Sequence, residues 1–128
     1  MNLNLDRLTD EVLRRLEKER PKALLIGRPP REDGGFLYVQ NEPYSAVVIG
    51  VLSPEKLLQM PTDPVCIALM EGLPVWLWPQ SYEKGKRAIL LRRELMAAEQ
   101  RLVRFGAKPV PVGSWWKERQ NDRRYGNG

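Results

Sequence analysis

Residues 46–55 read AVVIGVLSPE, and this stretch decides the fold. Its first four residues are apolar and rich in Val and Ile, and they run to Gly50 without polar alternation. Such a run indicates a strand of a parallel sheet that is covered on both faces. Ser53, Pro54 and Glu55 then provide a hydroxyl cap, a proline at the first helical position and an acid in the first turn, so a helix should begin there. A strand that passes directly into a helix is the repeating unit of an α/β domain.

The same alternation extends outward along the chain. Apolar runs bounded by glycine or proline predict further strands, and helical periodicity with glycine stop signals predicts further helices. The connection 27–35 is polar and too short for a regular helix, so the first crossover is either abbreviated or a hairpin-like excursion. The predicted elements are strands at 23–26, 36–39, 46–52, 74–78 and 108–112 and helices at 53–60, 63–72 and 81–106. They predict fold class α/β, as a small three-layer domain with a mainly parallel sheet of about four or five strands.

Two terminal segments flank this domain, which we place at residues 21–112. The first, residues 1–20, is predicted to be a short amphipathic helix with one narrow apolar stripe that must bury against this domain or another protein. The stripe consists of Leu5, Leu8, Val12 and Leu16, at steps of three and four. The second segment, residues 113–128, is basic and lacks periodicity. We expect it to be disordered or pinned by Trp115 and Trp116, and favour the pinned form because adjacent tryptophans are costly to leave in water.

The composition excludes several classes of enzyme. A chain of 128 residues can build one sizeable core. It has no histidine and one cysteine, Cys66, so a His-triad hydrolase, a Cys–His protease, a zinc finger and a His-ligated iron site are excluded. Cys66 lies between apolar neighbours and is predicted to be a small core residue. The lone cysteine and the absence of a signal-peptide pattern lead us to expect a cytoplasmic protein, and no apolar run is long enough to span a membrane.

The net charge of +5 is concentrated in one predicted helix. Residues 84–104 hold seven basic residues against Glu94 and Glu99, which accounts for the whole excess. A positive helix face can meet phosphates or an acidic partner, but a solvated outer face explains the pattern better. Nucleic-acid binding through this helix therefore stays as a second alternative function.

The candidate ligand-binding residues lie at predicted strand ends. Neither G-x-G-x-x-G nor G-x-x-x-x-G-K-[ST] occurs in the chain. Open α/β sheets nevertheless bind ligands at the carboxyl ends of their strands, which makes Gly27, Ser53 and Gln80 the candidates. A simple helix cap explains Ser53 equally well. Trp76 and Trp78 are two residues apart and should point to the same side of their strand, as core or interface residues. No catalytic residue and no metal ligand is assigned.

Two stretches carry a resemblance to a known family. Residues 46–60, AVVIGVLSPEKLLQM, are followed by Asp63 and then by residues 68–75, ALMEGLPV. This pattern resembles the flavoprotein-like proteins encoded with ethanolamine and propanediol utilisation systems. In those proteins a strand ending in V-I-x-x-L-S/T is followed by a short helix, an aspartate and an A-L-x-x-G-K-P-V step; Leu73 stands where that pattern usually has lysine. The stripe in residues 1–20 is also similar to the amphipathic helices of proteins targeted to bacterial microcompartments.

The resemblance implies a Rossmann-like or flavodoxin-like fold and an association with a bacterial microcompartment, a protein-shelled organelle. Related flavoproteins bind FMN through a glycine- and serine-rich loop after the first strand and an asparagine in the helix that follows the Ser or Thr. This chain has Gly27-Arg28-Pro29-Pro30 in the loop, and Glu55 and Lys56 in the latter region. We therefore expect no cofactor, with FMN as the alternative.

These observations favour an interaction or assembly protein with a degenerate flavoprotein-like fold. Its expected partners are microcompartment shell or core enzymes, bound through the stripe of residues 1–20. The alternative is a small FMN- or nucleotide-binding domain. We also regard a homodimer as reasonable because of the exposed tryptophans and the short first crossover.

Overall fold

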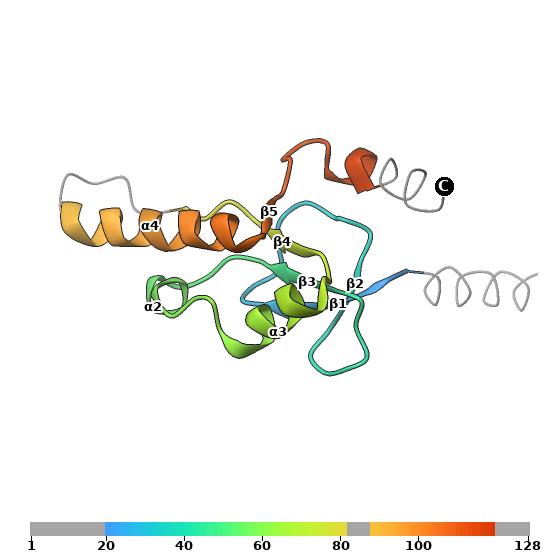
Figure 1. Ribbon diagram of the computed structural model, residues 1–128. Coiled ribbons are helices and arrows are strands. Elements are labelled where there is room, and N and C mark those ends of the chain that lie inside the picture. The colour runs from blue at the N-terminus through green and yellow to red at the C-terminus, as the bar shows by residue number, and fades with distance from the viewer. Residues whose placement is uncertain (1–19, 82–87, 120–128) are drawn as a thin grey trace, which may run out of the picture.

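The computed structural model describes residues 20–81 and 88–119, and the stripe of Leu5, Leu8, Val12 and Leu16 therefore lies outside the described residues. The described elements are β1 (Lys22–Ile26), β2 (Leu37–Val39), β3 (Ala46–Ile49), α2 (Pro54–Leu58), α3 (Asp63–Glu71), β4 (Val75–Leu77), α4 (Ile89–Phe105) and β5 (Lys108–Pro109) (Figure 1). Each neighbouring pair of strands is parallel, and the order is β2-β1-β3-β4-β5. The predicted α/β class and parallel sheet are confirmed, and this order is that of flavodoxin-like domains.

The stretch that decided the fold forms the centre of the sheet. All four residues of β3 are buried, and β3 pairs with β1 on one side and β4 on the other. The Ser53 hydroxyl accepts a hydrogen bond from the Lys56 N–H at 3.2 Å, so Ser53 caps α2 as predicted. Gly72 ends α3 at φ +77°, the left-handed conformation that favours glycine at a helix end. Local sequence signals therefore correctly predicted the start of α2 and the end of α3.

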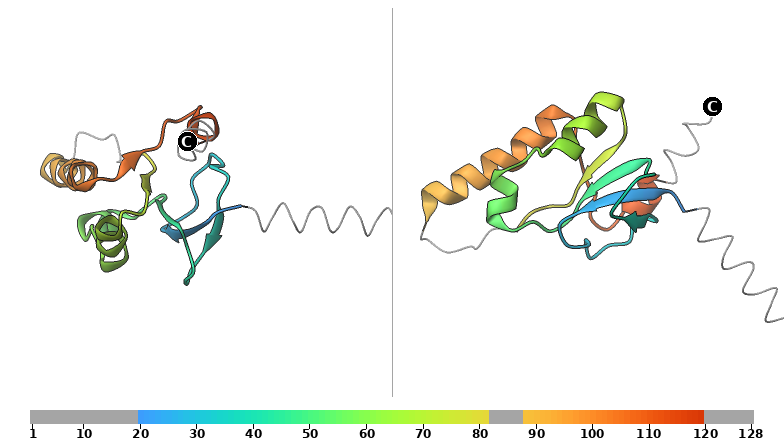
Figure 2. Two further views of the ribbon diagram at one scale, coloured as in Figure 1. Left: turned by 45° about the vertical axis from the view of Figure 1, so that its right-hand side comes forward. Right: turned by 90° about the horizontal axis from the view of Figure 1, so that it is seen from below.

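One face of the sheet is covered by helices. Figure 2 shows α2, α3 and α4 gathered on the same side. Alternate residues of β3 and β4 point to this side, including Val47, Ile49 and Leu77, and they form one core cluster with Leu57 of α2 and Leu102 of α4. The helices thus cover this face of the sheet with their apolar sides.

The opposite face is closed by aromatic side chains from outside the sheet. It carries Ala23, Val48, Trp76 and Trp78, so the two tryptophans share one side as predicted. The connection between β1 and β2 contains no helix, and the first crossover is the abbreviated form. Cover comes instead from Phe36, just before β2, and from Trp115, at the start of a helical segment at 115–119. The core thus extends beyond residue 112, the expected end of the domain.

Several expected boundaries are wrong for identifiable reasons. Helix α4 begins at Ile89 rather than Ser81, because Ser81 is not helical and Ala88 has φ +56°, which turns the backbone out of a right-handed helix. Strand β5 ends at Pro109 rather than residue 112. Cys66 is half-buried rather than fully in the core. The sheet and the other helices also cover α4 unevenly, since Leu91 near its start is 44% exposed whereas Leu95 one turn later is 4% exposed.

Candidate functional site

The carboxyl edge of the sheet brings the three candidate ligand residues together around residues 50–53. Gly27 follows β1, and a Cβ there would lie 2.5 Å from the Val51 carbonyl oxygen. Ser53 is the last residue of the segment 50–53. Gln80 follows β4, and its side chain forms hydrogen bonds with Gly50 and Leu52 of that segment. The crevice between β1 and β3 is where the strand order reverses, and it is the usual ligand site of this fold.

The backbone itself closes that crevice. Arg28 and Val51 form an isolated antiparallel bridge: the Arg28 N–H donates to the Val51 carbonyl at 2.9 Å, and the Val51 N–H donates to the Arg28 carbonyl at 2.8 Å. The fit is close enough that a Cβ at Gly50 would overlap the Arg28 carbonyl. The Gly50 N–H donates to Ile26. The loop after β1 therefore lies against the end of β3 and takes up the donors that could have faced a ligand.

Gln80 ties the ends of β3 and β4 together. Its side-chain oxygen accepts from the Leu52 N–H at 2.9 Å, and its Nε2 donates to the carbonyls of Gly50 and Trp78, both at 2.7 Å. The Gln80 backbone N–H donates to the Glu99 carboxylate of α4 at 2.9 Å. Each polar group of the side chain is thus satisfied within the protein, as a structural clamp requires.

We asked whether these residues fit the FMN that the flavodoxin-like fold implies. A phosphate at this edge is normally bound by backbone N–H groups and a helix N-terminus. Here the N–H groups of Arg28, Val51 and Leu52 all donate within the chain, and the Ser53 hydroxyl caps α2. The residues present do not fit an FMN phosphate in the crevice between β1 and β3.

A smaller groove lies beside the closed crevice. It has a volume of about 360 Å³ and is lined by the end of β1, by Gln40, by Lys56 of α2 and by Thr62 and Pro64 at the start of α3. Gly27 belongs to this lining, and Lys56 is its charged residue. The groove could take a small anion, since the described part of its lining holds no carboxylate.

The opposite face is closed by a clamp that the local sequence pattern did not predict, because its parts are about eighty residues apart. Both Glu32 carboxylate oxygens accept backbone N–H groups, one from Gly113 at 2.8 Å and the other from Trp115 at 3.2 Å. Glu32 thereby caps the start of the helical segment 115–119. A Cβ at Gly34 would lie 2.7 Å from the Trp115 ring, and one at Gly35 would overlap the Trp116 ring. The two adjacent glycines are a seat for two adjacent tryptophans, a correspondence that no local pattern reveals.

Arg119 completes the clamp. Its guanidinium lies 3.7 Å from the centre of the Phe36 ring and donates to the Gly34 carbonyl. Nearby, burial raises the pKa of Tyr38 to about 12, with the negative charge of Asp33 acting in the same direction and Arg119 acting against it. Tyr38 is therefore a neutral phenol at physiological pH.

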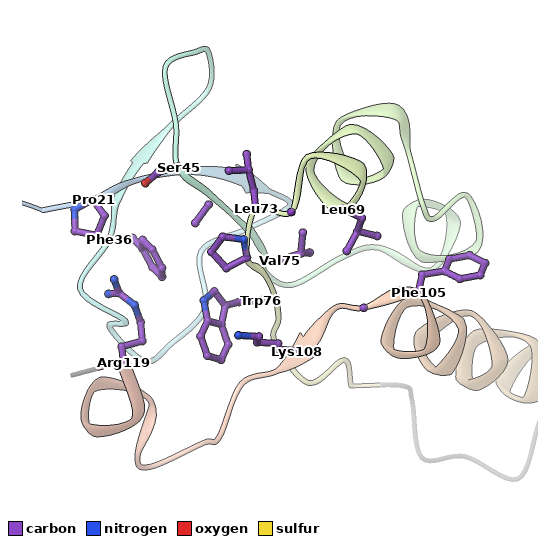
Figure 3. Close-up of a pocket in the computed structure, with 14 residues that line it drawn as sticks. Pro21, Phe36, Ser45, Leu69, Leu73, Val75, Trp76, Phe105, Lys108 and Arg119 are labelled. Carbon is purple, nitrogen blue, oxygen red and sulfur yellow. The ribbon is translucent and has the colours of Figure 1, made fainter. Parts of the chain in front are cut away.

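A wider groove runs along the amino ends of the strands (Figure 3). It has a volume of about 830 Å³. Figure 3 shows Arg119, Trp76 and Lys108 toward one end and Leu69 and Phe105 toward the other. The Lys108 ammonium lies 5.6 Å from the centre of the Trp76 ring. Among the residues that the structure describes, the lining includes two cations and no carboxylate, so this groove suits an apolar group that carries a negative charge.

The basic residues of α4 do not form one free surface. Arg101 donates through Nη2 to the Met60 carbonyl at 2.5 Å and so ties α4 to the connection between α2 and α3. Arg93 and Arg104 are exposed, whereas Arg92 is only partly so. The other basic residues of the stretch, Lys84, Lys86 and Arg87, lie outside the described residues. Within the described part of α4, the basic surface is narrower than the sequence suggested.

Two further classes of site were examined. In residues 20–81 and 88–119, no three His, Cys, Asp or Glu side chains are grouped closely enough to hold a metal ion. No helix in the same ranges has both the length and the apolar character needed to cross a membrane. Comparison of the chain with protein-family models, with curated proteins and with solved structures finds no match.

Proposed function

We propose that this chain is an interaction or assembly protein associated with a bacterial microcompartment of ethanolamine or propanediol utilisation. The stripe of Leu5, Leu8, Val12 and Leu16 docks on shell or core enzymes, and the α/β domain is the folded body that carries it. We assign no catalytic residue. The resemblance of residues 46–75 to flavoprotein-like proteins of these utilisation systems supports the association with a microcompartment.

The observation that carries the non-catalytic part of the proposal is the closed carboxyl edge. A flavodoxin-like enzyme needs an open crevice at the point where the strand order reverses. The Arg28 and Val51 bridge occupies that place, and the three side-chain hydrogen bonds of Gln80 close the neighbouring ends of β3 and β4. A fold that uses its ligand edge to stabilise itself is suited to presenting surfaces to other proteins.

The test is co-purification with shell proteins and core enzymes produced in the same cells. Deletion of residues 1–20 should abolish it. A finer variant, Leu8→Glu with Val12→Glu, should also abolish it, because two charges on the stripe cannot be buried against a partner. The matched control is Arg7→Gln with Arg14→Gln, which lowers the net charge equally on the opposite side of the predicted helix. Co-purification that survives the deletion, or that is lost equally in the control, would contradict the docking role.

A second candidate function is a small nucleotide- or FMN-binding domain that uses the groove beside Gly27. The observation in its favour is the position of that groove at the end of β1, with Lys56 in its lining and no carboxylate among the described lining residues. Addition of FMN or AMP should then raise the melting temperature, and Lys56→Ala should remove the shift. A colourless protein whose melting temperature neither ligand changes would eliminate this candidate.

A further inference from the structure

Helix α4 carries two apolar stripes, and the core uses one of them. Leu95, Ala98 and Leu102 are buried against the sheet and the other helices. Ile89, Met96 and Val103 are spaced by seven residues and lie on another side of the helix. Their side chains are 51%, 50% and 40% exposed. A polar outer surface is the norm for a helix on a small domain, so this outer stripe requires an explanation.

The surroundings extend the apolar surface. A groove of about 620 Å³ borders the stripe and is lined by Leu77, Pro79 and Pro109, by Ala97 and Val103 of α4, and by the polar residues Glu99, Gln100 and Arg104. The amino-terminal half of α4 also extends beyond the strands (Figures 1 and 2). The outer stripe and the groove share Val103 and together form one surface.

We infer that this surface binds a second copy of the chain, with the two α4 helices antiparallel and the two-fold axis close to Met96. The stripe is symmetric about that residue, because Ile89 and Val103 are each seven residues from Met96. A two-fold axis there places Ile89 of one copy against Val103 of the other and pairs the two Met96 side chains. An isologous interface needs a patch that is complementary to itself, and this stripe meets that condition.

The charges that flank the stripe favour the same arrangement. The antiparallel pairing brings Arg92 of one copy close to Glu99 of the other and Arg93 close to Gln100. A parallel pair would instead set Arg92 of one copy close to Arg93 of the other, and these like charges repel.

The size of the surface predicts a weak dimer. The 17 residues of α4 span about 25 Å, and one helix pair with the adjacent groove is smaller than a standard protein interface. We expect a dissociation constant on the order of 10 μM. The inference is independent of the proposed function, because it makes no use of residues 1–20.

Sedimentation equilibrium of the full chain tests the dimer. The wild type should approach twice the mass of one chain as the concentration passes the dissociation constant. Met96→Glu should weaken association at least about tenfold, because it places two carboxylates on the axis. Met70→Glu is the matched control: it introduces the same charge at a methionine of α3 that is 87% exposed, and it should leave the dimer unchanged. Circular dichroism checks that both variants fold.

Spin labels test the orientation. In a Cys66→Ser background, which removes the single native cysteine, labels at Met96→Cys should lie close together across the axis. Labels at Ile89→Cys should lie about 20 Å or more apart, since fourteen residues of helix separate position 89 from its counterpart along the pair.

The inference is overturned by a wild type that remains monomeric about tenfold above the expected dissociation constant. A dimer that survives Met96→Glu overturns it as well, as does one that is lost in the Leu8→Glu and Val12→Glu variant, because the interface would then lie on the stripe of residues 1–20. Short distances between labels at position 89 would show a parallel pair and would also overturn it.

Discussion

The two faces of the sheet differ in how their cover is built. On the helical face, α2, α3 and α4 each contribute buried residues, so the burial is spread over many side chains. On the opposite face, one fully buried tryptophan, Trp115, packs on Phe36 and Trp76 with ring centres 5.9 Å apart in both pairs. That tryptophan is held by Glu32 and by the close approach of its ring to Gly34. A short segment can therefore replace a helical layer when one large side chain is positioned by a few specific contacts.

The largest effect expected is that of Trp115→Ala. It should lower the free energy of unfolding by about 3–5 kcal/mol, against about 2–5 kcal/mol for Leu102→Ala on the helical face. Trp115→Phe should cost much less, because the indole Nε1 is buried without a hydrogen-bond partner among the described residues, and phenylalanine removes that unsatisfied group. Guanidinium denaturation measures all three. A Trp115→Ala variant as stable as the wild type would show that the second face does not depend on the tryptophan.

The next effect separates packing from backbone strain at the glycine seat. Gly35 and Gly72 have nearly equal positive φ values, +79° and +77°, so alanine strains both by about 1–2 kcal/mol. A Cβ at Gly72 meets nothing within 4 Å, whereas one at Gly35 overlaps the Trp116 ring. Gly35→Ala should therefore lower the free energy of unfolding by about 1–3 kcal/mol more than Gly72→Ala. Equal losses in denaturation experiments would mean that the seat has no role in packing.

The smallest effect concerns pH and the clamped face. The pKa of Tyr38 is about 12 in the folded protein against 10.0 for an ordinary tyrosine, so the folded state holds this proton more tightly than the unfolded state. The resulting contribution to stability is fully present below pH 10 and is lost as the pH rises through about 12. The free energy of unfolding should fall more steeply over this range in the wild type than in Tyr38→Phe. Parallel pH profiles for the two proteins would contradict the burial of this phenol.

Local patterns were sufficient for the elements and for some of their ends, but not for all of them. The apolar run of β3, the Ser53 cap and the Gly72 stop each depend on residues within a few positions, and the structure confirms them. The start of α4 was misplaced because the φ of +56° at Ala88 is unusual for a residue other than glycine. Gln80 was correctly placed at the carboxyl edge, yet its hydrogen bonds to Gly50 and Leu52 depend on a strand order that periodicity does not encode.

By itself, the sequence determined that this protein is an α/β domain without histidine chemistry, because strand and helix signals and residue types are local properties. Tertiary structure alone decided that the carboxyl edge is closed, that Gly34 and Gly35 receive the tryptophans, and that the outer stripe of α4 remains uncovered within the described residues. Each of these depends on segments distant in the chain meeting in space. Their contacts arise from the whole fold, so no window of neighbouring residues contains them.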